Sequence, residues 1–291
     1  MRLKSVDLPT LGRPIMATIG GPAVVADGTG AVCVEDFLVR GMWNRISTVT
    51  QDFWQTQPSS RYTLVEMTPF HMNWDEIDDV LLDMDGTLLD RHFDNFFFEE
   101  ELPRRYAALH SLTFEESRDR LMAMYRSVEG ELAWTDLHYW SQRVGIDVVA
   151  MTKDLDHMIG FLSGAEEFLR HLRELGKRVI IVTNAHESGV AIKVAKTGLD
   201  RHVDRIVNAF EVGYLKMRPE YWPRCQQLLG FDPARSFYMD DDEGCLVAAQ
   251  QFGVAHLIHS AKSSSQLPPV PLSQFISVTG FASLINGRPV L

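Results

Sequence analysis

From residue 165 to residue 258 the sequence alternates between helical apolar spacing and short apolar runs typical of buried strands. The expected helices are Ala165–Leu175, Ser188–Lys196, Pro219–Leu229 and Glu243–Phe252. The expected strands between and after them are Arg178–Val182, Arg205–Val207, Ser236–Met239 and Val254–Ile258. This alternation predicts an α/β fold with a Rossmann-like, doubly wound, mostly parallel sheet covered by helices on both faces.

An earlier apolar run, Val80–Leu82, leads directly into two aspartates, Asp83 and Asp85. Side chains two residues apart on an extended segment point the same way and lie about 7 Å apart. Gly86 lets the backbone leave the strand in a conformation that a side chain would disfavour. Taken alone, the stretch is equally consistent with an acidic turn, so partner residues elsewhere must decide whether it is a site.

Polar side chains also follow the other expected strands, where parallel α/β sheets bind their ligands. They are Thr183, Asn184, Lys216, Asp240, Asp241 and Asp242. Lys216 could instead be a surface lysine, and Asp240–Asp242 could be a solvated turn. Their occurrence at successive strand ends, together with Asp83 and Asp85, indicates one shared site.

Five carboxylates aimed at one crevice would repel each other unless a cation joined them. An all-oxygen set without histidine or cysteine favours a hard ion, and Mg²⁺ would suit a phosphate co-ligand. Lys216 would supply further positive charge, and the Thr183 hydroxyl would hold phosphate oxygens. The chemistry that fits is phosphoryl transfer, with Asp83 as nucleophile and Asp85 as general acid and base.

Four segments resemble motifs one to four of the haloacid dehalogenase-like (HAD) hydrolase superfamily over roughly residues 79–258. They are Asp83-Met-Asp-Gly-Thr87, Val182-Thr-Asn184, Gly213-Tyr-Leu-Lys216 and Tyr238-Met-Asp-Asp-Asp242. The resemblance implies that Asp83, the Asp85 carbonyl and Asp241 bind Mg²⁺, with Asp240 beside the metal. It also implies that Thr183, Asn184 and Lys216 bind phosphate. Asp242 stands where serine is common, which blurs the choice of acidic ligand.

Further stretches are similar to the bacterial GMP/IMP nucleotidases within that superfamily. They are Met72–Asp90, Phe93–Phe96, Leu137–Trp140, Thr183–His186 and Thr197–Asp200. This resemblance implies an enzyme that hydrolyses purine 5′-nucleotides. The alternatives are a phosphatase or phosphomutase for another metabolite, such as phosphoglycolate or a sugar phosphate, and an inactive binding module. Arg218 departs from the common Lys-Pro pattern and is interpreted as a solvated arginine rather than a phosphate contact.

Residues 91–159 show helical spacing, with a capping-box pattern from Thr113 to Glu116. The other helices expected there are Phe96–Leu109, Trp134–Val144 and Thr152–Ile159. The segment resembles the type-one (C1) helical cap of the superfamily. We therefore expect a cap domain over residues 91–159 and a core domain over residues 72–90 and 160–291. A packing decoration is the alternative, but an insertion so close to the aspartates favours a lid.

Residues 1–71 are rich in glycine and proline without a sustained period, so we expect little fixed structure there. The segment is either a partner-binding extension or sequence upstream of a true start at Met72, and the second reading is favoured. The net charge of −11 argues against nucleic acid and anionic membranes as partners. Three unpaired cysteines and the lack of a long apolar run predict a cytoplasmic protein. The family resemblance implies that its partner is a small-molecule phosphate monoester.

Overall fold

The computed structural model describes residues 71–286. The prediction of a poorly structured segment over residues 1–71 falls, apart from its last residue, outside the described residues. All of the described residues belong to one compact unit. Within residues 71–286 no helix is long and apolar enough to cross a membrane.

A six-stranded sheet with the order β3-β2-β1-β4-β5-β6 forms the centre of this unit. All of its pairings are parallel. The strands are β1 (Asp79–Leu82), β2 (Arg178–Thr183), β3 (Arg205–Asn208), β4 (Ser236–Asp240), β5 (His256–Ser260) and β6 (Ile276–Val278). The strand order reverses between β1 and β4, which is where open parallel sheets bind ligands.

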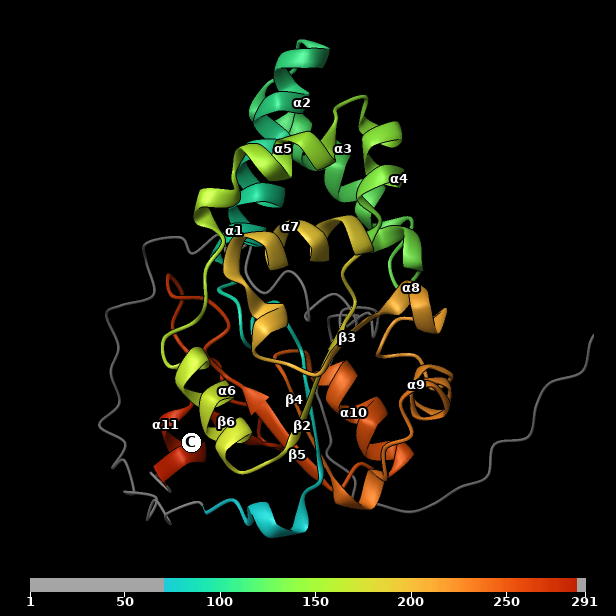
Figure 1. The fold of residues 1–291 in the computed structure, drawn as a ribbon. Helices are drawn as coiled ribbons and strands as arrows, with labels where there is room; N and C mark the ends of the chain where they lie inside the picture. Colours follow the sequence, from blue (N-terminus) through green and yellow to red (C-terminus); the bar gives the residue numbers. More distant parts are fainter. Residues whose placement is uncertain (1–70, 287–291) are drawn as a thin grey trace, which may run out of the picture. The chain divides into compact units, whose positions relative to one another are not determined.

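Two buried apolar clusters lie on the two faces of the sheet. On β1, Val80 and Leu82 belong to one cluster and Leu81 to the other, as the alternation of side chains along a strand requires. The helices of this part are α6 (Ala165–Glu174), α7 (Glu187–Thr197), α8 (Ala209–Val212), α9 (Tyr221–Leu229), α10 (Glu243–Phe252) and α11 (Ala282–Asn286). Figure 1 shows α6 and α11 on one side of the sheet and α9 and α10 on the other. The predicted doubly wound α/β class is confirmed.

The segment between β1 and α6 is helical, as expected. It contains α1 (His92–Phe96), α2 (Leu102–His110), α3 (Phe114–Arg126), α4 (Leu137–Val144) and α5 (Val148–Asp154). Figure 1 shows α2 to α5 grouped on the far side of α7 from the sheet. The predicted capping box is present at α3, since Thr113 Oγ1 accepts from the Glu116 N–H at 3.2 Å and the Glu116 carboxylate accepts from the Thr113 N–H at 2.9 Å. The division into cap and core domains stays a prediction.

Several predicted helix boundaries in this segment were wrong because polar caps set the ends. Asp136 accepts backbone N–H bonds from His138 and Tyr139, so α4 begins at Leu137 rather than at Trp134. Asp147 caps α5 through the Ala150 N–H, so that helix begins earlier than predicted and ends at Asp154. In the sheet, the last strand was predicted at Val254–Ile258, but β5 spans His256–Ser260.

Candidate active site

Three of the predicted acids meet where β1 and β4 end. Asp83 directly follows β1, Asp240 ends β4, and Asp241 comes next. Carboxylate oxygens of these three residues lie within 4.8 Å of one another. The two strands are paired neighbours, with Leu82 opposite Met239, and this register brings together acids from distant parts of the chain. The parallel sheet therefore builds the acidic cluster that the motifs predicted.

Lys216 lies inside this cluster and is only 1 % exposed. Its ammonium pairs with Asp83 and lies 2.7 Å from Asp240. The Tyr238 hydroxyl also donates to Asp240. Burial alone would lower the pKa of Lys216, but the carboxylates of Asp240 and Asp83 raise it well above its usual value. Lys216 is therefore a fixed positive charge against the Asp83 carboxylate.

The charges in the cluster are not balanced by lysine alone. Burial raises the pKa of Asp83 well above its usual range, Lys216 lowers it, and Asp240 and Asp241 add to the rise. Burial raises the pKa of Asp241 to about 7, against the lowering effect of Arg91 and with a further rise from Asp240. Carboxylates that resist ionisation beside one another, with only oxygen donors, suit a hard divalent cation. The residues present therefore fit a magnesium-type site.

Arg91 is a cluster residue that the sequence interpretation missed. Its guanidinium forms an ion pair with Asp241 and is largely buried. Only the tertiary structure reveals this contact, because 150 residues separate the two side chains.

Asp85 stands apart from the three clustered acids. Its carboxylate lies 2.7 Å from the ammonium of Lys193 on α7. The same ammonium lies 2.8 Å from Asp94 on α1. Neither Lys193 nor Asp94 was predicted to take part in the site. The sequence gives only a weak sign that Lys193 is buried. It comes four residues after Gly189, and both lie on the buried face of α7.

Hydrogen bonds fix the residues at the end of β2, and one of these residues holds the loop that carries Lys216. The side-chain carbonyl of Asn184 accepts the backbone N–H of Lys216 at 2.8 Å. Thr183 is buried, and its hydroxyl oxygen accepts the Ala185 N–H at 3.1 Å. His186 caps α7, because its Nδ1 accepts the Ser188 N–H at 3.2 Å. Thr183 and Asn184 are therefore held at the strand end where the motif was expected.

The turn after β1 requires glycine at position 86. Gly86 has a φ of +89°, and a Cβ there would lie 2.4 Å from a carboxylate oxygen of Asp241. Asp242, the departure from the usual serine, caps α10 by accepting the Cys245 N–H at 2.9 Å. The backbone N–H of Asp242 in turn donates to Asp240 at 2.8 Å. The Asp242 side chain therefore caps the start of α10, next to the acidic cluster.

Arg218 is not simply a solvated arginine. Its guanidinium donates two hydrogen bonds, at 2.9 and 3.1 Å, to the carbonyl of Gly130 in the inserted segment. The side chain is exposed, as expected, but it connects the loop after Lys216 to the insertion.

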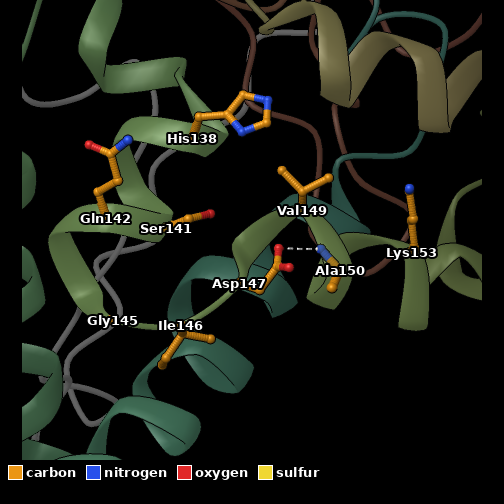
Figure 2. Close-up of a pocket in the computed structure, with 9 residues that line it drawn as sticks. All are labelled: His138, Ser141, Gln142, Gly145, Ile146, Asp147, Val149, Ala150 and Lys153. Carbon is orange, nitrogen blue, oxygen red and sulfur yellow. Dashed lines mark hydrogen bonds between the residues drawn. The ribbon is translucent and has the colours of Figure 1, made fainter.

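A pocket of about 580 Å³ lies elsewhere, between α4 and α5 (Figure 2). Figure 2 shows the bond from the Ala150 N–H to Asp147 at its edge. The lining residues are His138, Ser141, Gln142, Gly145, Ile146, Asp147, Val149, Ala150 and Lys153. None of the predicted site residues lines this pocket, so it is separate from the acidic cluster.

Residues 77–253 match the family model of the haloacid dehalogenase-like hydrolases, and the chain belongs to that family. It is an enzyme of the hydrolase class, as the motifs predicted. Among known proteins, the chain is 34 % identical over 217 residues to the GMP/IMP nucleotidase YrfG of Escherichia coli (strain K12) and to that of Shigella flexneri. Each of these matches covers 74 % of this chain and 98 % of the relative.

Solved structures show the same fold at much lower sequence identity. A HAD phosphatase from Thermococcus onnurineus matches with a TM-score of 0.60 at 17 % identity, covering 74 % of this chain and all of that one. A putative beta-phosphoglucomutase from Thermotoga maritima matches with a TM-score of 0.51 at 16 % identity, covering 72 % of this chain and 97 % of that one. Both similarities show a shared fold.

Proposed function

We propose that this hydrolase is a Mg²⁺-dependent phosphatase that cleaves small phosphate monoesters through a phosphorylated Asp83. The observation that carries the proposal is the placement of Lys216, buried between Asp83 and Asp240 in a cluster of three acids. A buried lysine beside a carboxylate nucleophile supplies the positive charge that a transferring phosphoryl group needs.

The proposed mechanism assigns each step to a named residue. A carboxylate oxygen of Asp83 attacks phosphorus, and the bond from phosphorus to the alcohol oxygen breaks. Asp85 gives its proton to the leaving oxygen. Water then attacks phosphorus, Asp85 takes a proton from that water, and Asp83 is freed together with inorganic phosphate. Thr183 and Lys216 hold the phosphate, and Asn184 fixes the loop that carries Lys216.

In this proposal Asp83, the backbone carbonyl of Asp85 and Asp241 bind the metal, with Asp240 beside them. Bound Mg²⁺ would neutralise charge on the transferring phosphoryl group. The proposal is supported by the close approach of the Asp83, Asp240 and Asp241 oxygens and by the all-oxygen chemistry of the set.

For the substrate we propose purine 5′-nucleotides, GMP and IMP. The support is the 34 % identity to nucleotidases, which extends over nearly their whole length. Residues 91–159 would act as a cap that recognises the nucleotide above a core of residues 72–90 and 160–291. A cytoplasmic location goes with this proposal, since Cys225 and Cys245 are free and buried.

A panel of phosphate esters tests the proposal. Phosphate release is measured with Mg²⁺ for GMP, IMP, AMP, a pyrimidine nucleotide, phosphoglycolate and a sugar phosphate, with Asp83→Asn as the inactive control. We expect GMP and IMP to have the highest kcat/KM. A best substrate without a purine would overturn the nucleotidase assignment, and no release from any ester would overturn the phosphatase assignment.

A further inference from the structure

A second buried lysine, Lys193, contacts the second aspartate of the strand-end turn. It is 5 % exposed, and its ammonium lies 2.7 Å from Asp85 and 2.8 Å from Asp94. A buried ammonium is costly unless carboxylates or other acceptors surround it. The contacts join three parts of the chain: α7, the turn after β1, and α1 at the start of the inserted segment.

We propose that Lys193 is a positioning residue that holds the Asp85 carboxylate toward the substrate and ties it, through Asp94, to the inserted helices. This rests on the proposed function only in giving Asp85 the role of general acid and base. Within residues 71–286, Lys193 forms no ion pair with any of the three clustered acids, so it acts through Asp85.

The two buried lysines form ion pairs with different acids. Lys216 pairs with Asp83 and Asp240, and Lys193 pairs with Asp85 and Asp94. Each lysine thus faces one of the two aspartates of the turn. An acid that must reach the leaving oxygen needs a fixed orientation, and geometry within hydrogen-bond reach is the first requirement for proton transfer.

The backbone of the turn is already fixed without Lys193. The Gly86 N–H donates to the Leu89 carbonyl at 2.8 Å, and the backbones of Asp85 and Leu89 pair as in a parallel sheet. What the backbone leaves open is the rotation of the Asp85 side chain about its own bonds. The ammonium 2.7 Å away selects one of those rotamers.

Asp94 connects this arrangement to the insertion. Its carboxylate shares the Lys193 ammonium with Asp85, and the ring centroid of neighbouring Phe93 lies 5.4 Å from the same ammonium. A shift of α1 relative to α7 would therefore change the position of Lys193 and, with it, that of Asp85. Loops and domains that close over substrate complete catalytic sites in this way.

The same helix supplies a matched control. Lys196 on α7 lies 3.2 Å from Asp156, so it also links α7 to the inserted segment. That pair is partly exposed and includes no predicted site residue. Lys196→Gln removes an ion pair between the same two parts of the chain without touching the turn after β1.

The experiment compares Lys193→Gln, Lys193→Arg, Asp94→Ala and Lys196→Gln with the wild type. Steady-state kcat and KM are measured for GMP, or for the alkyl phosphate that the wild type cleaves fastest. First-turnover product release is measured for the same ester and for p-nitrophenyl phosphate, whose leaving group needs no proton. Circular dichroism melts report folding.

For Lys193→Gln we expect kcat on the alkyl ester to fall about 100-fold, with KM changed less than about threefold. First-turnover release of nitrophenolate should fall less than about tenfold, because the missing acid matters little for that leaving group. Lys193→Arg should recover part of the loss, Asp94→Ala should show a smaller loss with the same leaving-group bias, and Lys196→Gln should match the wild type.

An equal loss for both esters in folded Lys193→Gln would overturn the proposal, as would an unchanged kcat. If that variant does not fold, Asp94→Ala decides, and a wild-type leaving-group ratio there overturns the tie to the insertion. A wild type that releases phosphate from no ester refutes the proposed function instead, so the two failures are distinguishable.

Discussion

The side-chain carbonyl of Asn184 accepts the backbone N–H of Lys216 at 2.8 Å, across 32 residues of sequence. The sequence motif assigned Asn184 to phosphate binding. In the structure this oxygen holds the loop that carries Lys216, and Lys216 in turn pairs with Asp83 and Asp240. Asn184 therefore connects the end of β2 to the positive charge that faces Asp83, the proposed nucleophile.

We expect Asn184→Ala to lower kcat about tenfold and the free energy of unfolding by about 1 kcal/mol, because the loop loses an anchoring hydrogen bond. Phosphate-release kinetics and urea unfolding measure the two effects. A rise in KM alone, with kcat and stability unchanged, would instead indicate that Asn184 binds phosphate directly.

Asp83→Asn should reduce turnover by more than about 1,000-fold, because an amide oxygen is too weak a nucleophile to form the phosphorylated intermediate. The variant should remain folded, since Lys216 keeps its pair with Asp240. Phosphate release and a thermal melt check both statements. Turnover retained by a folded Asp83→Asn protein would refute the nucleophile assignment.

Removal of divalent cation by a chelator should abolish activity, and addition of Mg²⁺ should raise the melting temperature. A cation at about 100 times its Kd would stabilise the folded state by about 2.7 kcal/mol. Asp241→Asn should greatly reduce the Mg²⁺-induced rise in melting temperature. Asp242→Asn is the matched control: its side chain caps α10 through Cys245, so the response to Mg²⁺ should persist.

The reverse result, with the Mg²⁺ response lost in Asp242→Asn and kept in Asp241→Asn, would exchange the roles of these two neighbouring acids. The melting readout is independent of turnover, so it tests the ligand set even in a variant that is inactive.

Acid should weaken the fold through His259. Burial lowers the pKa of His259 below its usual 6.5, and its Nδ1 lies 3.0 Å from the Ser277 hydroxyl. The unfolded chain then binds the proton more readily than the folded one. The contribution to stability is therefore complete above pH 6.5 and decreases as the pH falls below it, by at most about 1.4 kcal/mol per pH unit.

Urea unfolding from pH 5 to pH 8 measures this effect. His259→Gln should be less sensitive to pH below 6.5 than the wild type, because the amide does not titrate. His256→Gln, on the same strand but half-buried, controls for the loss of a histidine. An identical pH dependence in the wild type and His259→Gln would contradict the prediction.

Much of the fold and the site could be predicted because the signals are local. Val80–Leu82 leads directly into Asp83 at the end of one strand, and the capping box at Thr113 lies within one helical turn. The parallel sheet then places each strand end at the same edge, so Asp83, Asp240 and Asp241 meet as the motifs indicated. Helix ends were less predictable, because side-chain caps such as Asp136 outweighed apolar spacing.

The site residues that were not predicted share one property: each contacts a partner from a distant part of the chain. Arg91 reaches Asp241, and Lys193 reaches both Asp85 and Asp94. In sequence, Lys193 is an ordinary lysine of an amphipathic helix. Its burial follows from the packing of α7 between the turn after β1 and the inserted helices, and no local pattern records that packing.

The sequence by itself determined the parallel α/β architecture and the types of side chain at the strand ends, since periodicity and motif spacing are properties of short stretches. The tertiary structure alone decided which lysine faces which acid. That choice depends on desolvation and on distances of a few ångströms between segments far apart in the chain, and these exist only once the sheet and helices have packed.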